Sequence, residues 1–438
     1  MSLINEVKLG DIVAEISMGP FGSDIKTDNY VSSGVPIIRG GNLTSGRFNP
    51  DAGFVYLTKE KADSLGKANA YPDDVLITHR GTLGQVGIIP KGNYDRYVVS
   101  QSLLRLKIKT HEAHPFYVYY FLKSPIGQYR LLANTSQTGV PAISQPVTSI
   151  RAIKIPLPPL PVQRRIADIL GTLDDKIELN RRMNATLEEM ARALFKAWFV
   201  DFEPVRAKLD GRWQRGQSLP GLPAHLYDLF PDQLVDSELG EIPKGWGVGK
   251  LADMVKILSG GTPSTTNETY WNGLIPWYTV KDAPNESDVW VIDTEKRITE
   301  LGVKNSAAQI LPSYTTIISA RGTVGKLALT AGEMAMNQSC FGIRDLVNNN
   351  HFYTYYLIQN TVGMIQQSSH GTVFDTITRQ TFSTINVIIP DQDIRKAFDK
   401  TVQDWMHLIL EHNKQNITLS QKRDLLLPGL LTGKLLGD

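Results

Sequence analysis

Two short stretches of the chain carry the same polar turn. Residues 80–84 read R-G-T-L-G and residues 321–325 read R-G-T-V-G. Arginine presents a planar fork of N–H groups that can donate two hydrogen bonds to guanine or phosphate, and threonine adds a hydroxyl. The glycines permit a tight backbone and the close approach of another molecule. Because an apolar run flanks each turn on either side, a second interpretation is a plain β-hairpin whose arginine is a salt-bridge partner.

Further polar residues recur beside predicted strands. The Gly-rich segments 19–23 and 260–264 offer backbone N–H groups and hydroxyls suited to phosphate. Gln101 and Gln338, each followed by a serine, could read base edges because glutamine pairs bidentately with adenine. Equally, they could only satisfy buried backbone groups.

Loops 134–145 and 368–379 differ most between the two regions, and divergent loops on a shared scaffold are where different specificities would lie. Polar residues of the turns and loops, with nearby cations, form the predicted nucleic-acid contacts. They are Gly22, Ser23, Arg39, Arg80, Thr82, Gln101, Ser102, Thr138, Thr262, Ser264, Lys281, Arg321, Thr323, Lys326, Gln338, Ser339, His370 and Arg379. For the second region, this predicts that Lys250, Lys281, Arg321, Lys326 and Arg379 lie on one face.

The turns belong to a long internal repeat. Six blocks recur in the same order, which indicates two copies of one domain rather than a short-period solenoid. The paired blocks are 7–19 with 249–261, 34–43 with 274–283, 74–90 with 315–330, 99–106 with 336–343, 114–127 with 350–363, and 149–159 with 384–393. Most read as strands. The fifth pair carries aromatic residues at helical spacing and ends at a glycine; these aromatics could stack on bases, but the spacing favours a core helix.

Each copy leads into a long amphipathic helix. Apolar residues at three-and-four spacing predict helices over 161–199 and 394–427. The predicted seams contain Val162, Ile166, Ile169, Leu173, Ile177, Leu187, Met190 and Leu194 in the first helix, and Ile394, Phe398, Val402, Trp405, Ile409, Leu419 and Leu426 in the second. A helix of this length is roughly 60 Å long and must bury its seam against a partner.

Polar residues interrupt both seams at matching places. The repeat aligns Asn180 with His412 and Asn184 with Asn416. A polar residue in a helix seam reduces stability and fixes register and pairing. We therefore expect the two helices to pair with each other, or with equivalent helices of a partner. Between the copies, the Gly- and Pro-rich segment 201–246 predicts a connector with at most short helical turns.

Composition sets broad limits. The 438 residues are 42% hydrophobic with a net charge of +2, which predicts two or three domains with ample core. One cysteine, Cys340, no 18-residue apolar run and no signal pattern at the N-terminus predict a soluble, cytoplasmic protein without membrane contact. Residues 1–158 hold 17 Lys and Arg against 12 Asp and Glu, whereas residues 247–391 hold 10 against 12. Bulk charge thus suggests a polyanionic partner only for the first copy.

Motifs for catalysis are missing from the sequence. We find no phosphate-binding G-x-x-x-x-G-K-[ST] loop, no nucleophile elbow, no acidic pair of nuclease type and no metal-ligand spacing among the eight histidines. Pro158-Pro159 lacks the Asp or Asn that would precede it in an amino-methyltransferase motif. These observations predict a chain with no catalytic residue, metal or cofactor of its own.

The combined pattern resembles the DNA-specificity subunit of type I restriction–modification systems. The resemblance rests on the central block from IPLPPLPVQRRIADIL to KAWFVDFEP, on LPAHLYDLFPDQLVDSELGEIPKGW in the connector, and on the final KRDLLLPGLLTGKL. It covers essentially the whole chain.

This resemblance implies a mixed α+β fold with a pseudo-twofold repeat. Two target-recognition domains with β-sheet cores would each read one half of a split double-stranded DNA target, and the two helices would form an antiparallel coiled coil that sets their spacing. Two methylation subunits would supply S-adenosylmethionine-dependent adenine N6 methylation, and a restriction subunit would add translocation and cleavage with ATP and Mg²⁺.

The predicted boundaries follow the same scheme. They are 1–158 for target-recognition domain 1, 159–200 for the central helix, 201–246 for the connector, 247–391 for target-recognition domain 2, and 392–438 for the C-terminal helix and tail. Two alternatives stay open: a coiled-coil scaffold that does not bind DNA, and an enzyme with a cryptic methyltransferase or nuclease site.

Overall fold

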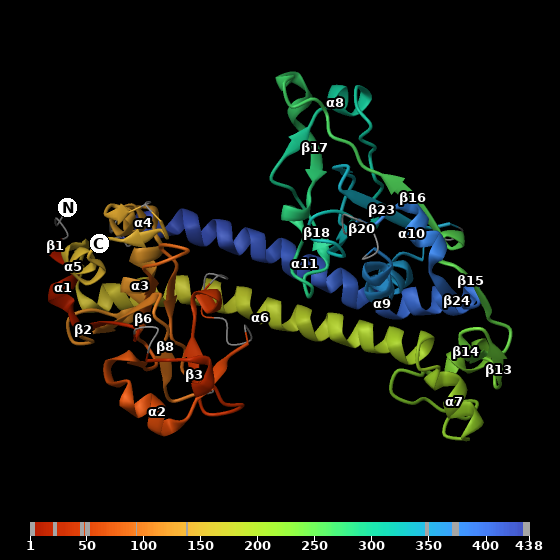
Figure 1. Cartoon of the computed structure of the whole chain (residues 1–438), viewed down its shortest axis with the longest axis horizontal. Helices are drawn as coiled ribbons and strands as arrows, with labels where there is room; N and C mark the ends of the chain where they lie inside the picture. The colour runs from red at the N-terminus through yellow and green to blue at the C-terminus, as the bar shows by residue number, and fades with distance from the viewer. Residues whose placement is uncertain are drawn as a thin grey trace. The chain divides into compact units, whose positions relative to one another are not determined.

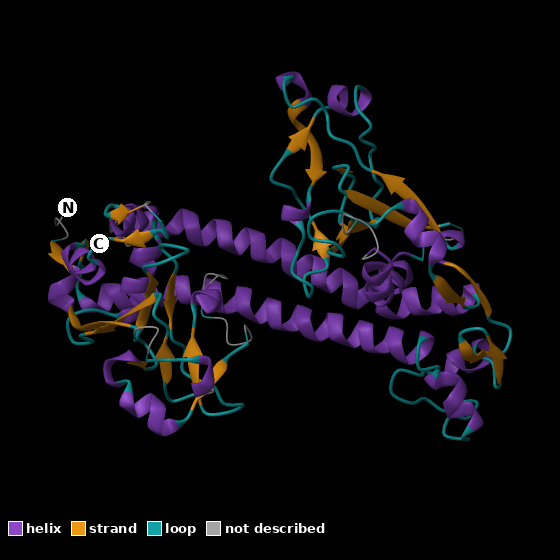
Figure 2. Cartoon of the chain, viewed as in Figure 1, coloured by secondary structure: helices purple, strands orange, loops and turns teal. Residues whose placement is uncertain are grey.

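The computed structural model divides into two compact units. Unit 1 comprises residues 1–176 and 418–438, and unit 2 comprises residues 177–417. The structure describes residues 5–20, 24–43, 48, 53–92, 94–136, 139–346, 350–369 and 376–431. Figures 1 and 2 show helices and strands in both units, as expected for a mixed α+β fold.

Unit 1 has a four-stranded antiparallel sheet in the order β2-β9-β6-β7. Its strands are β2 (Val13–Met18), β9 (Leu103–Ile108), β6 (Val75–Thr78) and β7 (Val86–Ile88). All four residues of β6 are buried because both faces of the strand are covered. Val75 and Ile77 belong to one core cluster and Leu76 to another. An uninterrupted apolar strand is the expected pattern for a sheet buried on both faces.

A second sheet of unit 1 has the order β4-β3-β8-β5. It consists of β4 (Val55–Leu57), β3 (Val35–Ile38), β8 (Tyr97–Val99) and β5 (Asn69–Ala70), with α2 (Lys59–Ser64) after β4. Strands β3 and β8 are parallel, so their carboxyl ends meet at the same edge. The unit is completed by β1 (Glu6–Lys8), α1 (Leu9–Ile12), β10 (Thr135–Ser136), β11 (Ala142–Ile143), α5 (Pro146–Ala152) and β12 (Lys154–Pro156).

Unit 2 repeats this topology and confirms the predicted duplication. Its main sheet has the order β16-β23-β20-β21-β18, in which the first four strands correspond to β2-β9-β6-β7. The strands are β16 (Val255–Ser259), β23 (Cys340–Asp345), β20 (Thr316–Ser319), β21 (Leu327–Thr330) and β18 (Trp290–Val291). The parallel pair of β17 (Trp271–Tyr278) with β22 (Ala335–Met336) corresponds to β3 with β8. Beside them lie β19 (Arg297–Ile298), α8 (Glu300–Lys304), α10 (Arg379–Thr384), and β15 (Gly247–Lys250) paired with β24 (Asn386–Ile389).

The aromatic helices form core, as expected, but they do not end at glycine. In unit 1, α3 (Pro115–Lys123) is followed by α4 (Pro125–Leu132), and Gly127 lies inside α4. In unit 2, α9 runs unbroken over His351–Ser369. The break occurs only in unit 1 because Pro125 has no N–H to continue the helix, and Ser124 caps the next one. Their buried aromatic residues are Tyr117, Tyr119, Tyr120 and Phe121 in unit 1, and Phe352, Tyr353, Tyr355 and Tyr356 in unit 2.

The long helices are α6 (Leu160–Phe199) and α11 (Gln392–Leu431). Helix α11 continues four residues beyond the predicted end, through Pro428, because Leu430 and Leu431 are buried in the core of unit 1. One predicted seam position is wrong. Met190 is 43% exposed, and Glu188 and Ala191 are buried instead. The apolar pattern missed Glu188 because its carboxylate accepts a hydrogen bond from Gln359 and lies 3.7 Å from Arg192.

The four polar residues of the seams do meet, in a crossed arrangement. Within unit 2, Nδ2 of Asn180 donates to Oδ1 of Asn416 at 2.9 Å, and Nδ1 of His412 lies 2.8 Å from Oδ1 of Asn184. Asn184 also donates to Asn413 at 2.7 Å. As the number rises along α6 it falls along α11, so the helices are antiparallel within this unit. The prediction that the two helices pair with each other is confirmed.

The connector is more structured than predicted. Besides α7 (Glu203–Leu209) and a 3₁₀ turn over Ala224–Leu229, it contains a hairpin of β13 (Leu234–Ser237) and β14 (Gly240–Pro243). Trp213 and Phe230 are buried in the main core of unit 2. The prediction of helical turns alone is therefore wrong, because the segment folds around its own aromatic residues.

Candidate nucleic-acid interface

The R-G-T-x-G turns close the β6–β7 and β20–β21 hairpins. Both glycines of each turn have positive φ, 84° and 78° in unit 1 and 77° and 90° in unit 2, which is costly for other residues. The last glycine also lies against a helix: a Cβ on Gly84 would lie 2.8 Å from Oε1 of Gln128. Arg80 and Thr82 are exposed, as are Arg321 and Thr323. Neither arginine forms an ion pair with the described residues, so the salt-bridge alternative has no support among them.

The Gln-Ser turns lie directly beside the arginine turns. In unit 1 the N–H of His79 donates to the carbonyl of Ser102 at 3.0 Å, and in unit 2 the N–H of Ala320 donates to Ser339 at 2.7 Å. The side chains of Gln101 and Gln338 are exposed. Among the described residues neither side chain bonds to a buried backbone group, and Oε1 of Gln338 accepts from the hydroxyl of Thr262.

The Gly-rich loops begin against the same turns. A Cβ on Gly19 would lie 2.0 Å from the carbonyl oxygen of Ser100, and one on Gly260 would lie 2.0 Å from that of Asn337. Only glycine allows this approach. Thr262 is exposed and its hydroxyl donates to Oε1 of Gln338, while the hydroxyl of Ser264 lies 2.9 Å from that of Thr266. Gly22 and Ser23 lie outside the described residues.

The divergent loops join the cluster through the same backbone positions. The N–H of Ile143 donates to the carbonyl of His79 at 2.9 Å, and the N–H of Ile377 donates to that of Ala320 at 3.0 Å. Thr138 and His370, which belong to these loops, lie outside the described residues. Arg379 begins α10 and donates to the hydroxyl of Ser259 at 2.9 Å. One hydrogen-bond pattern thus links three loops in each unit.

A capped turn follows β3 and β17. The carboxamide of Asn42 accepts from the N–H of Arg39 at 2.8 Å, and the carboxylate of Asp282 accepts from the N–H of Thr279 at 2.8 Å. These caps were not predicted, although Asn42 and Asp282 stand at aligned positions of the two copies, each three residues after the N–H that it accepts from. The guanidinium of Arg39 lies 5.5 Å from the ring centre of Tyr30, and Lys281 is exposed.

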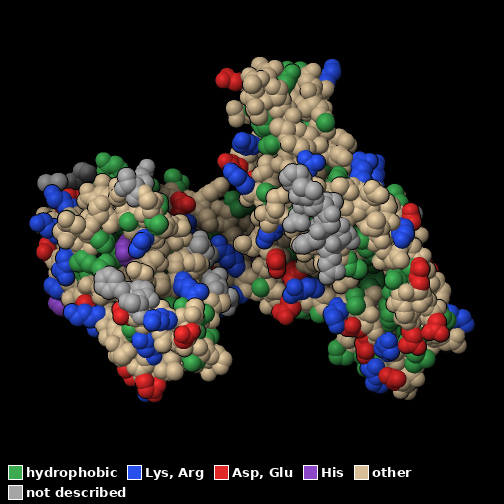
Figure 3. Space-filling model, viewed as in Figure 1, with side chains coloured by type: hydrophobic (Ala, Val, Ile, Leu, Met, Phe, Trp, Pro, Cys, Tyr) green, Lys and Arg blue, Asp and Glu red, His purple; other side chains and the backbone are tan. Residues whose placement is uncertain are grey.

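The residues predicted to contact nucleic acid are therefore joined only in part. Hydrogen bonds connect the arginine turns, the Gln-Ser turns, the start of each Gly-rich loop and the divergent loops. Lys250 takes no part in these hydrogen bonds; it lies on β15 and donates to Asn386 on β24. Figure 3 shows Lys and Arg side chains distributed over the visible surfaces with Asp and Glu between them. The common feature is thus a set of polar loops rather than a block of positive charge.

Comparison with known proteins identifies the family. The type I restriction modification DNA specificity domain matches residues 1–189 and 243–419. The chain belongs to this family. Its function is accordingly DNA recognition in a type I restriction–modification system.

Known specificity subunits match this chain over most of their own length. The specificity subunit of the type I restriction enzyme HindI of Haemophilus influenzae is 28% identical over 379 residues, covering 78% of this chain and 82% of that protein. The MjaIX specificity subunit of Methanocaldococcus jannaschii is 26% identical over 393 residues, covering 87% and 84%. A crystal structure of a type I restriction–modification S subunit from M. genitalium has a TM-score of 0.56 at 16% identity, covering 98% of this chain and 97% of that one. That likeness supports the fold.

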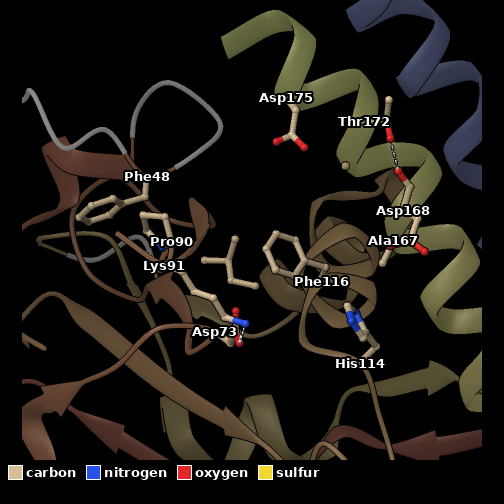
Figure 4. Close-up of a pocket in the computed structure, with 12 residues that line it drawn as sticks. Phe48, Asp73, Pro90, Lys91, His114, Phe116, Ala167, Asp168, Thr172 and Asp175 are labelled. Atoms are coloured by element: carbon tan, nitrogen blue, oxygen red, sulfur yellow. Dashed lines mark hydrogen bonds and ion pairs between the residues drawn. The ribbon is translucent and has the colours of Figure 1, made fainter. Parts of the chain in front are cut away.

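Each unit of the specificity chain also has a cavity. In unit 2, a cavity of about 440 Å³ is lined by Gly325 and Lys326, at the end of the arginine turn, and by Arg192 and Lys196 of α6. In unit 1, a cavity of about 660 Å³ lies between the globular part and α6. Figure 4 shows Phe116 and His114 on one side of it and Asp168 and Asp175 on the helix. No described helix is long and apolar enough to cross a membrane.

Proposed function

We propose that each unit of this specificity chain reads one half of a split double-stranded DNA target. The observation that carries the proposal is the repeated loop cluster. Both units place an exposed arginine, an exposed glutamine and a divergent loop on one hydrogen-bonded frame. Two equal reading surfaces in one chain suit a target with two separate parts.

The exposed side chains match the chemistry of base edges and phosphates. Arg80 and Arg321 can donate bidentately to guanine, and Gln101 and Gln338 can pair with adenine. Backbone N–H groups and hydroxyls of the Gly-rich loops suit phosphate contacts, which position a protein but carry little sequence information. Differences between the half-sites would then come from the divergent loops.

Partner subunits would perform the catalysis. We propose that two methylation subunits bind this chain and methylate adenine N6 with S-adenosylmethionine, and that a restriction subunit uses ATP and Mg²⁺. The specificity chain would supply no catalytic residue and no cofactor site. The support is the family assignment together with the absence of catalytic motifs from the sequence.

The long helices would set the number of base pairs between the half-sites. The buried polar pairs of α6 and α11 give the helices one register, because a shift would leave Asn184 and His412 without partners. Adding one helical turn to both helices lengthens each by about 5.4 Å. The spacer should then grow while both half-sites stay the same; an unchanged spacer would contradict this role.

Methylation mapping tests the reading function. The chain is expressed with its methylation subunit, and modified adenines are mapped in the wild type and in a variant whose residues 134–145 come from another family member. We expect a bipartite motif in which only one half changes. Exchange of residues 368–379 is the matched control and should change only the other half. Methylation without a bipartite motif, or changes in both halves, would contradict the proposal.

Two further measurements test the alternatives. DNA methylation or cleavage by the purified chain with cofactor or Mg²⁺ would indicate an enzyme. Normal assembly with partners but no DNA footprint over either unit would indicate a scaffold.

A further inference from the structure

The geometry points to Thr78 and Ser319 as positioning residues that fix the pose of the two DNA-reading arginine turns. This inference rests on the proposed reading function and deepens it. Thr78 is 1% exposed and Ser319 is 0% exposed, so neither can touch DNA directly. Each acts through the turn that follows it.

In unit 1, Thr78 closes the turn with four hydrogen bonds. Its hydroxyl donates to the carbonyl of Thr82 at 2.5 Å and accepts from the N–H of Gln85 at 2.9 Å. Its N–H donates to the carbonyl of Gln85 at 2.9 Å, and its carbonyl accepts from the N–H of Gly84 at 3.1 Å. One residue therefore holds both ends of the segment that contains Arg80.

In unit 2, Ser319 makes the same four bonds. Its hydroxyl donates to the carbonyl of Thr323 and accepts from the N–H of Lys326 at 2.8 Å. Its N–H donates to the carbonyl of Lys326 and its carbonyl accepts from the N–H of Gly325, both at 2.9 Å. The residue type differs between the units, but the hydroxyl and its two partners are retained.

A hydroxyl is needed because one buried atom must donate and accept at once. Ser and Thr do this with a short side chain, whereas Ala and Val of similar size do neither. The turns contain two glycines each, which supply the unusual φ but little stiffness. Without the hydroxyl, the arginine would have to be ordered when DNA binds, and that ordering lowers affinity.

The residue after each hydroxyl transmits this geometry to the other loops. His79 and Ala320 donate their N–H to the Gln-Ser turn and accept from the divergent loop through their carbonyl. A turn that is fixed at Thr78 or Ser319 thus also fixes the distance between the arginine and the glutamine. Loss of the hydroxyl should disturb discrimination between bases, beyond any loss of stability.

The test uses the full chain with its methylation subunit, on the mapped target and on targets with one changed base pair in either half. Thr78→Val should reduce discrimination about tenfold in the half read by unit 1 and leave the other half within twofold. Ser319→Ala should do the reverse. The exchanges Thr78→Ser and Ser319→Thr keep the hydroxyl and should stay within twofold of the wild type.

Matched controls separate positioning from stability. Ser17 in unit 1 and Thr330 in unit 2 also have buried, hydrogen-bonded hydroxyls, but neither bonds to an arginine turn: Ser17 donates to the carbonyl of Lys67, and Thr330 donates to the carbonyl of Pro312 and accepts from the N–H of Thr315. Ser17→Ala and Thr330→Val should lower the unfolding temperature without changing discrimination. If Thr78→Val prevents assembly with the methylation subunit, the half-site discrimination of Ser319→Ala decides whether the positioning role holds.

Arg80→Ala and Arg321→Ala distinguish the possible failures. If these change half-site discrimination while Thr78→Val and Ser319→Ala do not, the positioning role is wrong and the reading function stands. Equal losses in Thr78→Ser and Thr78→Val would also overturn the role. If the arginine variants and the loop exchanges leave both half-sites unchanged, the proposed reading function itself fails.

Discussion

In unit 1 the residue before Arg80 is His79, whose Nε2 lies 3.0 Å from the carbonyl oxygen of Gln101. Burial lowers the pKa of this imidazole. In unit 2 the same position is Ala320, which has no side-chain bond to make, yet its backbone bonds are the same. The comparison shows that the backbone frame of the loop cluster is common to both units, while the side chains around it have diverged.

The starts of the aromatic helices differ more between the two units than the loop clusters do. In unit 2 the carboxylate of Asp399 accepts hydrogen bonds from the N–H groups of Phe352 and Tyr353, at 3.1 and 2.7 Å. In unit 1 the aligned residue is Ala167, and Gln163 instead accepts from the N–H of His114 at 2.8 Å. Both solutions satisfy the free N–H groups of a helix start, but only unit 2 does so with a buried ionisable group.

The largest expected effect is on the stability of the two hydrophobic cores. Phe398 of α11 packs against Phe195, Trp198 and Phe199, with ring centres 5.5–6.0 Å away. Phe398→Ala should reduce the free energy of unfolding of unit 2 by about 3–5 kcal/mol. The aligned residue of unit 1 is Ile166, and Ile166→Val should cost only about 0.5–1.5 kcal/mol. Denaturant unfolding followed by hydrogen exchange in each unit measures both; equal losses would contradict the comparison.

The two seam asparagines should differ. Asn184→Leu leaves His412 and Asn413 without this buried partner and should cost about 2–3 kcal/mol. Asn180→Leu should cost less, about 1 kcal/mol, because its Oδ1 already has no partner among the described residues and Gln415 is exposed. Thermal unfolding measures both. A greater loss in Asn180→Leu would show that the crossed network is not the stabilising one.

Under the proposed function, Arg80 and Arg321 should act on separate halves of the target. Arg80→Ala should reduce binding to the preferred base by about 1–3 kcal/mol and relax specificity at one position of one half-site. Arg321→Ala should do the same in the other half. Competition binding with single-base variants of the mapped target measures this. A uniform loss across all sequences would instead indicate a phosphate contact.

The last expected effect concerns pH. Burial raises the pKa of Asp399 from 3.8 to about 7, although backbone N–H groups donate to it. Because the folded state holds the proton more tightly than the unfolded state, this residue favours folding most below pH 4, and stability is lost as pH rises toward 7.

Asp399→Asn cannot titrate. Its stability relative to the wild type should therefore increase by about 1 kcal/mol or more between pH 5 and pH 8. Asp393→Asn, at an exposed position of the same helix, is the control variant. Parallel pH profiles for Asp399→Asn and the wild type would contradict the expectation.

Much of this fold follows from local sequence pattern. The repeat predicted the two similar sheets, the apolar runs predicted their central strands, and the spacing predicted both long helices to within a few residues. The pattern failed where a polar residue satisfies its bonds in the tertiary structure, as Glu188 does with Gln359, and where a short aromatic-rich segment folds on itself, as around Trp213. Neither case has a periodic signal.

The candidate site was predicted in parts. Arg80, Gln101 and the divergent loop were each singled out from the sequence, but nothing local shows that His79 joins them. Asn42 and Thr78 were missed because their role is to hold backbone groups rather than to present a side chain. Thr78 could have been identified, because a hydroxyl residue stands two positions before the arginine in both copies.

The seam residues separate the two sources of information most clearly. The sequence by itself determined that Asn180, Asn184, His412 and Asn416 interrupt two equivalent helices, and therefore that they should meet. It aligned Asn180 with His412, since equivalent positions of a repeat differ by a constant number. Only the tertiary structure decided that Asn184 meets His412 and Asn180 meets Asn416. The physical reason is direction: in an antiparallel pair one number rises as the other falls, so contacts run opposite to the order of the repeat.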